Sequence, residues 1–332
     1  MGSNPFGYYV GNYMDSVREI YSPETIKNRA RRYKRMEGKI QFLVKEGKIK
    51  SMSPKNWSEA EVREYILYCK TLVSAADMVH EINALRQLLL FIDNPAVDLC
   101  LAHNPMLKPK FKGTRRKESM SDALYDLILE RSRNIDPGDF HRVRAYALVM
   151  MAITTGTRNK EIRLANVEDV DTTMWTFDII HVKGEGTYGL PRTVPLHPDV
   201  REILSLYLIL RKKWLVDNNL NSHALFPSKD SADGYLSGNA IRSIKATVED
   251  DLDVKFDLRM CRRTFGQRYL DSDVDIESVS VLMGHASTKT TEGFYSRKRL
   301  NKAIDKTAQL KQELVHTDVA KHSPNRTSDN DN

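Results

Sequence analysis

The sequence predicts a mainly α-helical protein with one small antiparallel β-sheet, divided into two domains. Apolar residues recur at helical intervals through most of the 332 residues, and β-rich segments occur around one glycine-rich turn, within residues 174–196. A basic segment with prolines and a glycine, residues 104–119, separates a helical first part from a mixed second part.

The first hundred residues predict a helical bundle. Ser22 is a candidate N-cap with Pro23 at the first helical position, and Ser58 and Glu61 have the spacing of a capping box. Residues 73–93 then place apolar side chains at helical intervals, without strand-like alternation. We assign residues 1–106 to a helical N-terminal domain and residues 107–118 to a basic interdomain linker.

The second domain, residues 119–300, is predicted to be mixed. Ser119 or Ser121 is a candidate cap for its first helix, and Gly156 is a plausible stop for an apolar helix over residues 139–155. Residues 158–167 are predicted to be helical. The two segments with strand character are residues 174–182 and 192–196. Further helices are expected at residues 197–215, 237–250, 257–271, 275–285, 287–298 and 301–315, before a disordered tail at residues 316–332.

Composition and charge limit the classes of function that the protein can have. A formal net charge of +7 is modest, but residues 27–50 and 108–117 are strongly basic, whereas residues 248–257 are acidic. Either basic cluster alone fits a solvated helix face as well as a binding surface, and the two together favour a nucleic-acid partner. The apolar runs are too short to span a bilayer, and nothing suggests secretion, so we expect no membrane association and a cytoplasmic location, with nucleoid association when bound to DNA.

Metal and nucleotide chemistry have little support in the sequence. The three cysteines are far apart and form no C-x-x-C pair, and neither a phosphate-binding glycine loop nor an H-E-x-x-H motif is present. We therefore expect no metal, no nucleotide and no other cofactor.

A set of polar residues between positions 158 and 295 is the main functional signal. Each has an ordinary structural explanation when taken alone: Arg158 can pair with Glu161, His285 can bond to backbone, and Lys183 at a turn is expected to be solvated. Tyr295 can be an aromatic residue that packs near the end of a basic helix.

Together, these residues resemble the tyrosine recombinases, the family that includes the phage and Xer integrases. The first motif of that family, T-G-x-R-x-x-E-I, is present as Thr155, Gly156, Arg158, Glu161 and Ile162. The second, H-x-L-R-H-T-F followed by L-G-H and a tyrosine, is matched by the segments "RMCRRTF", "LMGH" and "TTEGFY". Lys183, ahead of "RTVPL" at residues 192–196, best matches the lysine of the family's β-hairpin. The resemblance covers about residues 118–300.

The resemblance implies a role for each matched residue. Tyr295 would be the nucleophile that forms a 3′-phosphotyrosyl intermediate with DNA, and Lys183 would be the general acid. Arginines offer forked donors that fit phosphate oxygens, and His285 adds another donor. The implied catalytic residues are Arg158, Lys183, Arg259, Arg262, His285 and Tyr295.

The sequence departs from the family pattern at three places. Arg259 stands where the family usually has histidine, and an arginine donates hydrogen bonds but cannot accept a proton as neutral histidine can. The usual "GKG" of the hairpin is "KGEG", which displaces Lys183 and puts Glu185 near the expected lysine. Tyr295 lies ten residues after His285, where nine is commoner.

We therefore predict a site-specific recombinase or integrase that cuts and rejoins double-stranded DNA, with a helical core-binding domain and a mixed catalytic domain. A topoisomerase of type IB and a catalytically silent DNA-binding protein of the same fold are the alternatives. The resemblance also implies a homotetramer on two DNA sites, with the helix at residues 301–315 packing on a neighbouring protomer or on its own domain. Candidate contacts to the DNA backbone in the linker are Lys108, Lys110, Lys112, Arg115, Arg116 and Lys117.

Overall fold

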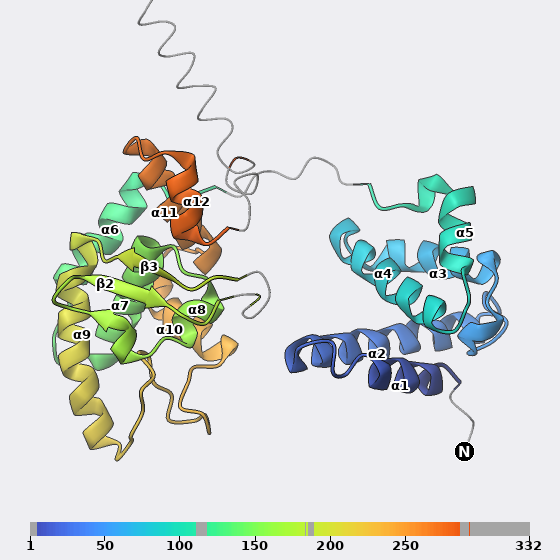
Figure 1. Ribbon diagram of the computed structural model, residues 1–332, viewed down its shortest axis with the longest axis horizontal. Helices are drawn as coiled ribbons and strands as arrows, with labels where there is room; N and C mark the ends of the chain where they lie inside the picture. The colour runs from blue at the N-terminus through green and yellow to red at the C-terminus, as the bar shows by residue number, and fades with distance from the viewer. Residues whose placement is uncertain (1–4, 111–117, 183, 185–188, 286–291, 293–332) are drawn as a thin grey trace, which may run out of the picture. The chain divides into compact units, whose positions relative to one another are not determined.

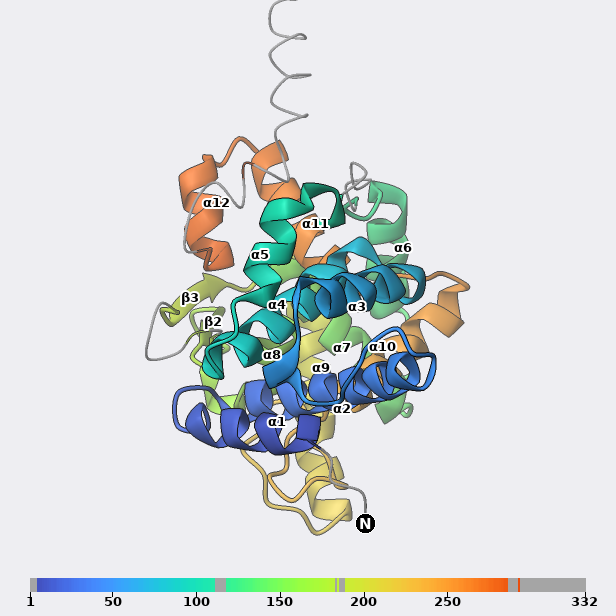
Figure 2. The ribbon, with the colours of Figure 1, turned by 90° about the vertical axis from the view of Figure 1, so that its right-hand side faces the viewer.

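The computed structural model describes residues 5–110, 118–182, 184, 189–285 and 292. The contacts between Cα atoms divide the chain into two units, Met1–Arg115 and Arg116–Asn332. The division falls inside the basic segment at residues 104–119. Each unit has its own hydrophobic core, and we describe each by itself (Figures 1 and 2).

Among its described residues, the N-terminal unit contains helices and connecting turns but no strand. Its five α-helices are α1 (Pro5–Ser16), α2 (Pro23–Lys45), α3 (Glu59–Leu72), α4 (Ala75–Phe91) and α5 (Ala96–His103), with 3-10 turns at Pro54–Asn56 and Pro105–Leu107. Helix α2 packs beside α1 and α4, and α5 packs on α3 and α4 (Figure 2). The Ser22 cap with Pro23 and the Ser58–Glu61 capping box are both present, as predicted.

The second unit combines helices with a three-stranded antiparallel sheet. Its helices are α6 (Asp122–Arg133), α7 (Phe140–Thr155), α8 (Asn159–Arg163), α9 (Pro198–Asp217), α10 (Gly238–Leu252), α11 (Leu258–Asp271) and α12 (Ile276–Met283), with a 3-10 turn at Val167–Asp169. Its strands are β1 (Val170–Asp171), β2 (Thr176–Ile179) and β3 (Arg192–Pro195), in the order β1-β2-β3. The predicted fold class is thus confirmed.

Helix α7 is the centre of the second unit. Every side chain from Ala145 to Ile153 is buried, and the helix contacts α6, α9, α10 and α11. A helix that is apolar all round requires neighbours on every face. The helix ends at Gly156, the stop expected from the sequence, and the φ of this glycine is 62°, a left-handed conformation.

The strands of the sheet are shorter than the sequence pattern predicts, and the sheet has one strand that was not predicted. Phe177 pairs with Val194 and Asp178 with Thr193, so that buried and more exposed pairs alternate along β2 and β3. The structure limits β2 to four residues and adds the two-residue β1, which is too short to have an alternating pattern. The helix expected over residues 158–167 is the short α8 followed by a 3-10 turn.

The start of the second unit is attached to α11. The backbone N–H of Met120 donates to Thr264 Oγ1 at 2.9 Å, and Arg263 Nε donates to the carbonyl oxygen of Glu118 at 2.9 Å. Arg263 and Thr264, which provide these two side chains, follow Arg262 directly in the sequence. The chain therefore enters this unit against the helix that bears a predicted catalytic arginine. Among the described residues, no helix is both long and apolar enough to cross a membrane.

Replacing Gly156 with alanine is expected to destabilise the second unit by about 2–4 kcal/mol. A Cβ at this position would lie 2.5 Å from Phe265 Cδ1, and a positive φ adds strain for any residue with a side chain. Gly238→Ala is the matched control, because a Cβ there meets nothing within 4 Å. Urea unfolding followed by circular dichroism measures both variants. A Gly156→Ala protein as stable as the wild type would contradict this interpretation of the turn.

Candidate active site

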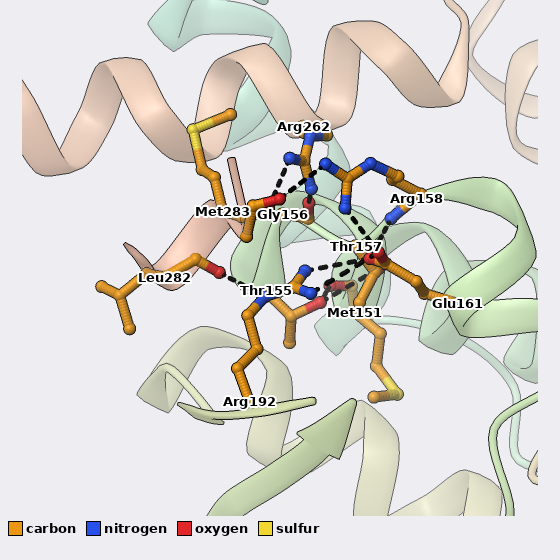
Figure 3. A network of polar contacts seen from close by, with 11 residues as sticks. Met151, Thr155, Gly156, Thr157, Arg158, Glu161, Arg192, Arg262, Leu282 and Met283 are labelled. Carbon is orange, nitrogen blue, oxygen red and sulfur yellow. Dashed lines mark hydrogen bonds and ion pairs between the residues drawn. The ribbon is translucent and has the colours of Figure 1, made fainter. Parts of the chain in front are cut away.

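Three arginines donate to three consecutive carbonyl oxygens at the C-terminal end of α12 (Figure 3). Arg192 Nε donates to the oxygen of Leu282 at 2.7 Å, and Arg262 Nη2 donates to that of Met283. Arg158 Nη2 donates to the oxygen of Gly284 at 2.8 Å. The three side chains come from β3, from α11 and from the residue before α8. Segments far apart in the sequence are thereby joined at one helix end.

The end of α12 provides these acceptors because the helix terminates abruptly. Gly284 has a φ of 61°, its N–H donates to the carbonyl oxygen of Val281 at 2.8 Å, and the N–H of His285 donates to that of Ser280 at 3.0 Å. This is the Schellman pattern, which leaves the carbonyl groups at positions 282–284 without helical partners. Cations are favoured at this negative end of a helix.

Glu161 connects two of the three arginines. Its Oε1 accepts from Arg158 Nη1 at 2.6 Å, and its Oε2 accepts from Arg192 Nη2 at 2.9 Å and from the backbone N–H of Arg158 at 2.8 Å. The carboxylate side chain is fully buried. Burial raises the pKa of Glu161, but the hydrogen bond and the charge of Arg192, together with the bonds from Arg158, outweigh this and lower the pKa below its ordinary value.

Arg262 joins the first motif to the second. It lies on α11, and its Nη1 donates to the carbonyl oxygen of Gly156 at 2.6 Å while its Nη2 reaches Met283. Gly156 ends α7 and precedes Arg158 by two residues. The two bonds of Arg262 therefore link the end of α7 to the end of α12. The two predicted catalytic arginines thus lie in one network, 104 positions apart in the sequence.

His285 directly follows the three residues whose carbonyl oxygens accept from the arginines. We call Arg158, Arg192 and Arg262, together with Glu161 and His285, the arginine cluster. Burial and the nearby charges of Arg262, Arg158 and Arg192 lower the pKa of its imidazole to about 4. The ring is therefore neutral at physiological pH, and it can donate one hydrogen bond without adding a full charge.

The structure brings together only some of the predicted site residues. Arg158, Arg262 and His285 belong to the cluster, whereas Arg259 is exposed and makes no hydrogen bond or ion pair with another described residue. Lys183 and Tyr295 lie outside the described residues. Lys108 and Lys110 are exposed, and the remaining linker candidates, Lys112, Arg115, Arg116 and Lys117, also lie outside the described residues.

Two members of the cluster had no predicted role. The sequence indicates Glu161 only as a residue of the first motif and as a partner of Arg158, a pairing that is present, and it indicates Arg192 only as the first residue of a strand. A signal for Arg192 exists in the sequence: it lies two positions before Val194 and therefore on the same, buried face of β3. A charged residue on a buried face needs charged or hydrogen-bonding partners.

The cluster is suited to holding an anion. The site contains three guanidinium groups and one carboxylate, so positive charge is in excess among its described residues. The Arg158 side chain is 29% exposed, and its two bonds to Glu161 and Gly284 use two of the five N–H donors of a guanidinium. Arginine donors of this kind fit the oxygens of a phosphate group.

Comparison with known proteins identifies the family of this chain. The model of the phage integrase family matches residues 120–302, more than half of the chain. The tyrosine recombinase XerC of Pseudomonas syringae is 24% identical over 291 residues, 84% of this chain and 87% of the relative. XerC of Oceanobacillus iheyensis is 26% identical over 302 residues, 87% of this chain and 91% of the relative.

Solved structures show the same fold. The Tn1549 transposon integrase, in complex with transposon right end DNA, aligns with a TM-score of 0.60 at 14% identity, over 88% of this chain and 98% of its own. The XerH site-specific recombinase bound to its difH substrate aligns with a TM-score of 0.56 at 20% identity, over 80% of this chain and 75% of its own. The chain belongs to the phage integrase family, and thus to the tyrosine-type site-specific recombinases.

Titration of His285 tests the electrostatics of the cluster. The folded pKa of about 4 lies below the ordinary 6.5, so the unfolded chain binds the proton more tightly. The contribution of His285 to stability is therefore complete above pH 6.5 and is lost as the pH falls from 6.5 towards 4. We expect NMR titration of the assigned His285 signal to give a midpoint near 4, and a higher midpoint in Arg262→Gln. A midpoint near 6.5 in the wild-type protein would contradict the described environment.

Proposed function

We propose that the chain cuts and rejoins double-stranded DNA through a 3′-phosphotyrosyl intermediate, with Tyr295 as nucleophile. The observation that carries this proposal is the convergence of Arg158, Arg262 and a neutral His285 at the end of α12. Family membership supports it, because Arg158, Arg262 and His285, which match motif residues of the tyrosine recombinases, meet there.

The chemistry follows from the kinds of residue involved. Tyr295 gives up its phenolic proton to solvent, its oxygen attacks the phosphorus, a phosphotyrosyl ester forms, and the bond to the 5′-oxygen breaks. Arg158 and Arg262 neutralise the negative charge that develops on the non-bridging oxygens, and His285 donates a further hydrogen bond. Lys183 gives the departing 5′-oxygen its proton. The reverse reaction, attack by a 5′-hydroxyl group, restores the phosphodiester without ATP, because the phosphotyrosyl ester retains the free energy of the bond that was broken.

We propose no phosphate contact for Arg259. It is exposed on α11, and its role depends on DNA that approaches that face. An arginine at this place can hold a phosphoryl oxygen, but it cannot take up the proton that a neutral histidine would accept.

The N-terminal unit and the basic linker are proposed to bind the DNA backbone. Helix α2 exposes Lys27, Arg31, Lys34, Arg35 and Lys45, whereas Lys39 pairs with the buried Glu81 at 3.2 Å. The two DNA-bound neighbours support a DNA partner, and a homotetramer on two sites is proposed from the family resemblance. Binding through backbone contacts becomes weaker as salt rises.

Covalent capture of DNA tests the proposed reaction. Because the target sequence is unknown, a pool of nicked duplexes with randomised sequence is incubated with the protein, and adducts that resist denaturation are purified and sequenced. We expect adducts with the wild-type protein, in the presence of a metal chelator, and none with Tyr295→Phe. Arg158→Ala and Arg262→Ala should lower the cleavage rate about 100- to 1,000-fold while most of the DNA binding remains.

The matched control is Arg133→Ala, since Arg133 forms an ion pair with Asp199 at 3.6 Å and has no bond to the arginine cluster among the described residues. It should cleave at the wild-type rate. Adducts that survive in Tyr295→Phe would contradict the assigned nucleophile. A wild-type protein that binds the duplexes but forms no adduct would favour the silent DNA-binding alternative, and relaxation of supercoiled DNA without paired sites would favour a topoisomerase.

The role of Lys183 is tested by the leaving group. A duplex in which the 5′-bridging oxygen at the cleavage site is replaced by sulfur loses a thiolate, which needs no proton at neutral pH. We expect Lys183→Ala to cleave the normal duplex at least about 100-fold more slowly, within the usual range for general acid catalysis. It should cleave the sulfur-containing duplex nearly as fast as the wild-type protein. A defect of equal size on both duplexes would exclude Lys183 as the general acid.

A further inference from the structure

Arg192 differs from the other two arginines in how it is bound. Its side chain is 8% exposed, compared with 29% for Arg158. Its Nε donates to the carbonyl oxygen of Leu282 at 2.7 Å, and its Nη2 donates to Glu161 at 2.9 Å. Both edges of the planar guanidinium are therefore held by the protein. A group bound in this way has little access to DNA, so its contribution must act through its neighbours.

The neighbours of Arg192 are the parts that carry the proposed chemistry. Arg192 is the first residue of β3, so it follows directly the connection from β2 that contains Lys183. Leu282 lies three positions before His285, and Glu161 holds both the backbone and the side chain of Arg158. One side chain thus connects the sheet, the end of α12 and the start of α8 (Figure 3).

The contact with Arg192 is a second reason why position 284, directly before His285, requires glycine. A Cβ at Gly284 would lie 2.7 Å from Arg192 Nη1 and 2.9 Å from its Cζ, in addition to the strain of a φ of 61°. The Arg192 guanidinium packs directly against the backbone of the turn that carries His285. Any side chain at position 284 would displace either the turn or the arginine.

We propose that Arg192 is a positioning residue for strand cleavage: it fixes Arg158, through Glu161, and His285, through the end of α12, in one arrangement relative to β3. This inference rests on the function proposed above. Arg192 does not contact the phosphate. Its effect on the rate is indirect, because misplacement of the catalytic groups by about 1 Å can reduce a rate about 100-fold.

The test compares DNA binding with cleavage for substitutions at position 192, on the duplexes recovered with the wild-type protein. At saturating DNA, Arg192→Gln should lower the single-turnover rate of adduct formation about 100-fold while the Kd for DNA changes less than about threefold. Arg192→Lys keeps the charge but cannot bind Leu282 and both Glu161 oxygens together, so we expect a smaller loss, roughly 10-fold.

Arg211→Gln is the control for the loss of a buried arginine. Arg211 is also nearly fully buried and donates to backbone oxygens, with Nε 3.0 Å from that of Ala224 and Nη2 2.7 Å from that of Ser222. It makes no bond to the arginine cluster among the described residues. Its substitution should lower the melting temperature but leave the cleavage rate of the folded protein within about threefold of the wild type.

A double-mutant cycle tests the contact with Gly284. Gly284→Ala should slow cleavage in the wild-type background. The part of this loss that comes from the clash should disappear in Arg192→Gln, because the guanidinium is gone, while the part that comes from the positive φ should remain.

The outcomes separate this inference from the proposed function. If the wild-type protein forms no Tyr295-dependent adduct, the proposed function fails and this inference fails with it. If the adduct forms, wild-type cleavage by Arg192→Gln overturns the positioning role alone. Equal losses in Arg192→Gln and Arg211→Gln, or parallel losses of DNA binding and cleavage, also overturn it. Should Arg192→Gln fail to fold, the Arg192→Lys variant decides: cleavage at the wild-type rate contradicts the proposal, and slower cleavage with retained binding supports it.

Discussion

The unsatisfied carbonyl groups at the end of α12 are the constraint on which the candidate site depends. A helix that stops at a left-handed glycine leaves its last carbonyl oxygens without helical donors, and buried carbonyl groups must find other partners. In this chain Arg192, Arg262 and Arg158 supply those donors, in that order along positions 282–284. A requirement of backbone hydrogen bonding thus brings together three cations that would otherwise repel one another.

The members of the cluster differ in burial and charge, and therefore in the roles that they can have. Glu161 offsets part of the positive charge and is fully buried, so its carboxylate is bound to arginines rather than to water. Arg192 is almost inaccessible, whereas Arg158 retains contact with solvent. Burial and the surrounding charges lower the pKa of His285 and keep the ring neutral. The result is a positively charged site in which some groups are fixed by the protein and others are available to the phosphate that we propose.

Local patterns in the sequence predicted much of the fold. The caps at Ser22 and Ser58 and the stop at Gly156 were predictable because each depends on a few adjacent residues. Strand β1 was not, because two residues are too few to show a period. Arg158, Arg262 and His285 were identified by their motif, but the role of Arg192 required the packing of β3 against α12, which no sequence interval of fixed length encodes. The exposure of Arg259 likewise depends on how α11 is oriented in the unit.

A crystal structure of the chain bound to a duplex that contains its cleavage site tests the central claim most directly. The claim is that the carbonyl groups at positions 282–284 hold the arginines in place for the phosphate. We predict that one phosphate lies within hydrogen-bonding distance of Arg158, Arg262 and His285, with the three bonds to the carbonyl oxygens retained. A phosphate bound elsewhere, or arginines that leave the carbonyl oxygens in order to reach it, would contradict the claim.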